Sequence, residues 1–170
     1  MITTTFEEQF ERLVNTLPMH INADNTALQI RFDWGSHDKL IEFMAIPENI
    51  SKYPLIWLVE GKDKEDRVKG TISRDAKIII ATQSIGVSRR NREIYTMEYS
   101  GILNPVKNNL ITALECSGIS RMENEIGVSR IQEYSWNNVD KNAVGDVWMV
   151  ILIEATITFD TNNCINSIRF

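Results

Sequence analysis

The chain has 170 residues, of which 43% are hydrophobic and 24% are charged, a composition within the range of ordinary globular domains. This length fits one domain spanning residues 1–170 and is enough to bury a sizeable core. The formal net charge of −5 argues against a general binder of nucleic acids or anionic membranes, because affinity for phosphate comes from an excess of Lys and Arg.

The cysteines and the N-terminus give further limits. Cys116 and Cys164 are too few for a disulfide framework, and each lies beside an apolar segment, which predicts buried, reduced thiols. No stretch approaches the roughly 18 apolar residues of a membrane span, and the N-terminus is acidic and amphipathic, unlike a secretion signal. We therefore expect a protein that is made or assembled in the cytosol and has no membrane partner.

The chain opens with a predicted amphipathic helix. Its apolar residues recur at helical spacing: Phe6, Phe10, Leu13 or Val14, and Leu17. Thr5 followed by Glu8 has the form of a capping box, and Pro18 closes the run.

Two shorter elements follow. Residues 28–34 alternate between apolar and polar side chains, which predicts a half-buried strand whose apolar face carries Leu28, Ile30, Phe32 and Trp34. Residues 36–46 favour a short helix that Pro47 ends. With the opening helix, these elements occupy residues 1–50.

The centre of the chain predicts two buried strands and a helix. Residues 53–60 and 76–82 are compact apolar runs, and the solvated turn between them begins at Gly61. After a polar loop, Asn104-Pro105 supplies the N-cap and first residue of a helix over residues 105–117.

The most informative segment is the predicted final strand, residues 147–160. Every side chain from Val147 to Ile153 is apolar, which predicts cover on both faces, whereas apolar and polar residues alternate from Glu154 onward. A strand of this length reaches roughly 46 Å at about 3.3 Å per residue, whereas a usual strand has about 5 to 6 residues. We therefore expect part of it to extend past its own core toward another subunit.

Together these elements predict an α+β fold, in which an antiparallel or mixed β-sheet is flanked by two or three helices and has a long C-terminal strand or hairpin. The simplest arrangement pairs the strands antiparallel and places the helices on one face. Residues 119–145 are polar, with a strand expected near residues 131–136. No repeat or linker divides the chain.

Motifs of catalysis are mostly missing. His20 and His37 lie in polar, loop-like settings without the spacing of metal ligands, which predicts exposed structural histidines. No Gly-rich phosphate-binding string occurs. Glu154 interrupts an apolar strand, but its alternation with threonines favours a solvent or subunit-interface face over a buried acid. We therefore expect no catalysis, cofactor or metal.

One dense basic cluster stands out. Arg89, Arg90 and Arg92 lie in the polar loop, with Arg74 upstream. A solvated loop is the first interpretation. Contact with a protein neighbour comes second, and contact with nucleic acid comes third because the chain as a whole is acidic.

From residue 53 to residue 160 the chain resembles the tail-terminator and head–tail joining ring proteins of tailed bacteriophages. The resemblance implies that residues 53–160 are the family-like core and that residues 1–50 are an N-terminal helix and strand elaboration of it. The matching pieces are Tyr53-Pro54-Leu55-Ile56-Trp57-Leu58, Ile78-Ile79-Ile80, the passage from Tyr99 to Leu110 with its Leu103-Asn104-Pro105 start of a helix, and Gly145-Asp146-Val147-Trp148. The Asn- and Ile-rich composition is similar to that of phages of Bacteroides-type hosts, including the crAss-like group, whose neck contains several stacked rings.

The resemblance implies a virion structural protein at the head–tail junction or tail terminus, assembled in the host cytoplasm. It would form a homo-oligomeric ring of six or twelve subunits, contact neighbouring neck, portal or tail-tube proteins, and complete a channel for DNA without reading its sequence. An acidic lumen would repel passing DNA and let it slide. The expected contacts are the 105–117 helix and these side chains: Trp148, Val150, Leu152, Glu154, Arg89, Arg90 and Arg92.

Two alternatives from other classes stay open. One is a small soluble enzyme that uses acids such as Glu154 in a cleft between sheet and helices. The other is a ligand-binding domain whose cavity is lined by Trp57, Trp136 and Trp148, although packing in the core is the usual role of such residues.

Overall fold

The computed structural model describes residues 4–21, 25–45, 53–83, 93, 95–123, 125–134 and 148–162. Its elements, in chain order, are α1 (Phe6–Val14), β1 (His20–Ile21), β2 (Ala27–Leu28), β3 (Arg31–Gly35), α2 (His37–Ala45), β4 (Leu55–Val59), β5 (Lys64–Asp66), β6 (Thr71–Gln83), the π-helix η1 (Tyr95–Leu103), α4 (Asn104–Cys116), β7 (Ser120–Met122), β8 (Gly127–Tyr134) and β9 (Trp148–Asp160). The predicted α+β fold is confirmed.

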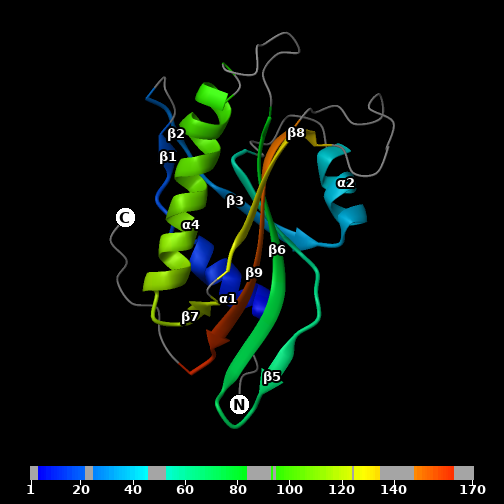
Figure 1. The fold of residues 1–170 in the computed structure, drawn as a ribbon, viewed down its shortest axis with the longest axis vertical. Helices are drawn as coiled ribbons and strands as arrows, with labels where there is room; N and C mark the ends of the chain where they lie inside the picture. Colours follow the sequence, from blue (N-terminus) through cyan, green and yellow to red (C-terminus); the bar gives the residue numbers. More distant parts are fainter. Residues whose placement is uncertain are drawn as a thin grey trace.

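A seven-stranded sheet forms the centre of the molecule (Figure 1). Its strands follow the order β3-β4-β6-β9-β7, while β5 pairs with β6 and β8 pairs with β9. β3 and β4 are parallel, and all other pairs in this sheet are antiparallel. β1 and β2 form a separate antiparallel pair. The sheet is therefore mixed.

The long final strand lies inside this sheet and does not project from it. β9 pairs with β6 at every position from Thr71↔Asp160 to Gln83↔Trp148, because both strands have 13 residues. On its other side β9 pairs with β7 and β8. The expectation that β9 reaches past its own core toward another subunit is wrong, since β6 matches its full length.

One face of the sheet carries the main core. β6 and β9 direct alternate apolar residues toward it, such as Ile78 and Ile153. Helices α1, η1 and α4 cover this face with a set of fully buried side chains: Phe6, Phe10, Leu13, Tyr99, Leu103, Val106, Leu110 and Leu114. The predicted stripe of the opening helix is confirmed for its residues within α1, and the capping box of Thr5 and Glu8 starts this helix. The prediction that Asn104 is an N-cap is wrong, because η1 continues directly into α4 and Asn104 is already helical.

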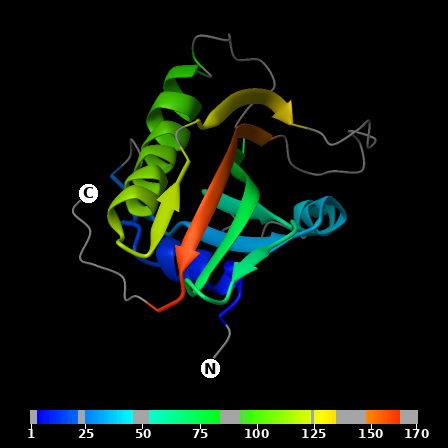
Figure 2. The ribbon, with the colours of Figure 1, turned by 60° about the horizontal axis from the view of Figure 1, so that its bottom comes forward.

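The opposite face is divided into an apolar half and a polar half. Helix α2 covers the apolar half, where Leu40 joins Trp57, Ile79, Trp148 and Val150 in a second cluster. Figures 1 and 2 show α2 and α4 on opposite sides of β6 and β9. The prediction that all helices share one face is therefore wrong. The predicted change along the last strand, from two covered faces to one, is confirmed, because the polar half starts at Glu154.

Several local expectations also need correction. Trp34 was expected on a buried face but is 47% exposed at the end of β3. Cys116 was expected to be buried but is exposed at the end of α4, whereas Cys164 lies outside the described residues. The expected turn after Gly61 contains strand β5, and β6 begins at Thr71, five residues before the predicted Ala76.

Candidate functional site

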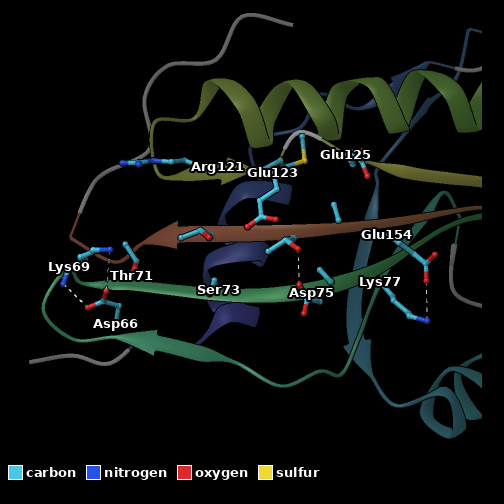
Figure 3. Close-up of a pocket in the computed structure, with 15 residues that line it drawn as sticks. Asp66, Lys69, Thr71, Ser73, Asp75, Lys77, Arg121, Glu123, Glu125 and Glu154 are labelled. Atoms are coloured by element: carbon cyan, nitrogen blue, oxygen red, sulfur yellow. Dashed lines mark hydrogen bonds and ion pairs between the residues drawn. The ribbon is translucent and has the colours of Figure 1, made fainter.

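The polar half of the second face forms the floor of an open groove of about 1140 Å³ (Figure 3). Strands β6 and β9 present alternate side chains to it, because successive residues of a strand point to opposite faces. The floor consists of Thr71, Ser73, Asp75, Lys77, Glu154, Thr156 and Thr158, and residues of β7 and its continuation, among them Arg121, Glu123 and Glu125, form one wall. The groove is a feature of the described surface that the apolar core does not explain.

Charges on the groove floor compensate one another across the strands. Lys77 and Glu154 are register partners, and Nζ lies 3.0 Å from Oε1. The Thr156 hydroxyl donates to Asp75 Oδ1 at 2.7 Å, and Lys64 Nζ lies 3.7 Å from the same carboxylate. The hydrogen bond from Thr156, followed by the charge of Lys64, lowers the pKa of Asp75. Such a floor behaves as a solvated, nearly neutral face.

This arrangement offers no visible catalytic acid. The Glu154 side chain is 51% exposed and ion-paired, so it lies on the solvated face that its alternation with threonines predicts. No histidine lines the groove, and no cluster of three His, Cys, Asp or Glu side chains among the described residues is arranged to hold a metal ion. Glu154 is therefore not the buried acid that the enzyme alternative expects in a cleft.

The expected contact residues on β9 take three different positions. Trp148 and Val150 are 0% exposed within the subunit, so neither side chain is available to a neighbour. Both are core residues, and the expectation that they contact another subunit is wrong. Leu152 is half-buried beside the second cluster, and Glu154 lies in the groove. The structure does not bring these four side chains into one surface patch. Arg89, Arg90 and Arg92 lie outside the described residues.

The tryptophans expected to line a ligand cavity are packed by their own neighbours. Phe43 of α2 lies against Trp57, with ring centroids 5.7 Å apart. Tyr53 meets Trp148 edge-on, also at 5.7 Å. Trp136 lies outside the described residues. The two described rings therefore belong to the second core cluster.

The two histidines lie far apart in the fold. His20 is 8% exposed in β1, so the expectation of an exposed histidine is wrong for it, and burial lowers its pKa. His37 is half-buried at the start of α2, where burial and then the charge of Lys77 lower its pKa. Figure 1 places β1 and α2 on opposite sides of the β6–β9 pair, so the histidines form no joint site.

A buried ionic cluster was missed by the sequence analysis, which grouped Arg74 with the surface arginines. The Arg74 side chain is 3% exposed; its Nη2 contacts Glu7 Oε1 at 2.6 Å and its Nε contacts Asp63 Oδ1 at 2.5 Å. Its guanidinium also lies 4.5 Å from the ring centroid of Phe6. Burial opposes protonation, but the bonds to Asp63 and Glu7 outweigh it and raise the pKa of Arg74. This cluster joins α1 to β6 and is structural.

The function of this chain is inferred from its sequence and from the geometry described above, because neither protein-family models nor curated proteins match it. Among the described residues, no helix combines the length and the apolar character needed to cross a membrane.

Proposed function

We propose that this chain is a structural subunit of a tailed-bacteriophage virion. It forms a homo-oligomeric ring at the head–tail junction or the tail terminus and completes the DNA channel there. Of the segments that carry the resemblance to phage ring proteins, the first three lie in or beside β4, in β6 and in the η1–α4 passage, and the described residue of the fourth, Trp148, begins β9. These elements are neighbours around the main and second cores, so the resemblance covers the centre of the fold rather than its periphery.

The observation that carries the proposal is that the sheet ends in two different strands. β3 is the last strand at one end, and β8 is the last strand beside the first half of β9 at the other. Within the described residues no strand pairs with the outer side of either. A cyclic ring needs two different, complementary surfaces on each subunit, and two unlike sheet edges provide them.

The mechanism is geometric rather than catalytic. The ring would present one annular face to the portal or neck and the other to the tail, and so start or stop tail assembly. The net charge of −5 favours a channel wall that repels DNA phosphates and lets DNA slide. The groove as a whole, floor and wall together, is compatible with such a channel wall, because its carboxylates outnumber its cations: Asp66, Asp75, Glu123, Glu125 and Glu154 against Lys69, Lys77 and Arg121.

Light scattering combined with size-exclusion chromatography tests this proposal. We expect the full chain alone to form particles whose mass is a fixed multiple of 19.5 kDa, or to add such a multiple to the mass of any portal or tail protein encoded beside it. Negative-stain electron microscopy should show these particles as rings. A clean monomer under all of these conditions, or a gene neighbourhood without portal and capsid genes, would contradict the proposal.

A further inference from the structure

The two open edges of the sheet are matched in direction. From β4 through β6 and β9 to β8, each strand is antiparallel to the one before it, and β3 is parallel to β4. β3 and β8 therefore run in opposite directions. If the β3 edge of a second copy is placed beside β8 with the same sheet face forward, the two strands are antiparallel and the sheet continues.

The side chains at these edges are matched as well. The register of the sheet links Trp34 to Leu58, Leu58 to Ile78, Ile78 to Ile153, and Ile153 to Val128. These residues form one row across the main-core face of the sheet, from β3 to β8, and the three inner residues are at most 1% exposed. The two end residues, Trp34 and Val128, are 47% and 39% exposed. An apolar row thus crosses the whole sheet and is uncovered only at its ends.

We propose that β8 of one copy pairs antiparallel with β3 of the next copy, so that Val128 meets Trp34 and the apolar row continues from subunit to subunit. This inference rests on the proposed ring and names the contact that closes it. The partner is a second copy of the chain, because β3 and β8 run in opposite directions and each carries one exposed end of the same apolar row. The two edges therefore complement each other. Contacts of this kind repeat head to tail and can close into a ring.

A local bond protects the β3 edge in the single chain. The Trp34 N–H donates to its own neighbour, Asp33 Oδ1, at 2.9 Å. Proteins commonly shield open edges with charged side chains to prevent uncontrolled pairing. The Asp33 carboxylate covers this donor until the strand of the next subunit replaces it.

Cysteine cross-linking tests the contact. Asp33 and Ser129 occupy the two ends of the adjacent row, through Trp57, Ile79 and Leu152. Opposite residues of antiparallel strands have Cα atoms about 4.5–5.5 Å apart, within the range of about 4.4–6.8 Å that a disulfide spans. In a background with Cys116→Ser and Cys164→Ser, the double variant Asp33→Cys with Ser129→Cys should give a ladder of covalent multimers on mild oxidation.

The single cysteine variants provide the matched controls. Each alone should stay monomeric in a denaturing gel, and an equimolar mixture of the two should stop at covalent dimers. Efficient dimers of either single variant would instead show a like-with-like contact and overturn the inference. A ring seen by light scattering without any ladder would also overturn it, while leaving the proposed function intact.

A second pair of variants tests the apolar row. Val128→Lys or Trp34→Lys should weaken self-association by about tenfold or more, because each places a charge in the continuing row. Val68→Lys is the control, since Val68 is 97% exposed in the turn between β5 and β6, away from both edges. Assembly that survives both edge variants would overturn the inference but not the ring. A wild-type chain that never assembles would overturn both.

Discussion

At the residue scale, Arg74 shows how a pattern can predict a side chain's direction without predicting its partners. Arg74 alternates with Ile72 and Ala76, so the period of the strand directs it toward the core. The sequence cannot show that Glu7, 67 residues away, approaches it from α1. The buried arginine was therefore mistaken for part of a surface cluster.

Replacing this arginine should destabilise the fold strongly. Arg74→Met leaves Glu7 and Asp63 close together without their cation, and loss of one partner of a buried ion pair costs about 3 kcal/mol. Lys77→Met is the matched control, because the Lys77–Glu154 pair is more than half exposed and exposed pairs contribute up to about 1 kcal/mol. Urea unfolding followed by circular dichroism measures both changes. Equal losses in the two variants would contradict the structural role of Arg74.

His20 gives a pH dependence with a defined sign. Burial lowers its pKa from the ordinary 6.5, so the unfolded chain takes up a proton at a higher pH than the folded chain does. The free energy of unfolding should fall as the pH drops below about 6.5, while the carboxylates of Asp66 and Asp75, with lowered pKa values, act only at a lower pH. His20→Gln should reduce this fall in urea titrations, and the fall that remains should come from His37, whose pKa is also lowered by burial. An unchanged slope would contradict the role of His20.

At the scale of elements, the sequence predicted strands best where apolar residues dominate. The first half of β6 was missed because Thr71, Ser73 and Asp75 resemble a loop, although they form the groove floor on one face. The sequence predicts the length of β9, but it does not show that β9 is paired within its own sheet. Only the structure shows that β6 is equally long and pairs with all of β9. The groove could not be predicted, because it depends on how far α2 covers the sheet.

The turn between β5 and β6 can be tested through Gly70. Its φ of 66° lies in the left-handed region, and its carbonyl accepts bonds from the Thr161 N–H and hydroxyl. Gly70→Ala should cost about 1 kcal/mol of stability, because a side chain strains this backbone and a Cβ displaces the amide of Asn162. Gly101→Ala in η1 should be neutral or slightly stabilising, since its Cβ has ordinary room. Thermal unfolding of both variants makes the comparison, and a neutral Gly70→Ala would show that the turn tolerates other conformations.

At the scale of the whole molecule, the described part of the fold buries an apolar interior but leaves the outer sides of β3 and β8 unpaired. The apolar half of β9, expected to be the contact between subunits, is buried inside one chain, whereas the apolar row that crosses the sheet is exposed at its two ends, Trp34 and Val128. Spacing in one sequence cannot reveal this, because edge and interior strands differ in their neighbours and not in their pattern. The proposed assembly therefore depends on backbone pairing and apolar contact rather than on the basic loop.

Salt provides a test that separates these two kinds of contact. At about 1 M salt the screening length is about 3 Å, so a ring held by Arg89, Arg90 and Arg92 against acidic neighbours should dissociate. A ring held by β3 and β8 should persist, because backbone hydrogen bonds and the Trp34–Val128 contact carry no net charge, and sulfate should strengthen it. Light scattering at increasing sodium chloride and sodium sulfate concentrations measures the particle mass. Dissociation to monomers in both salts would contradict a contact through the sheet edges and support one through Arg89, Arg90 and Arg92.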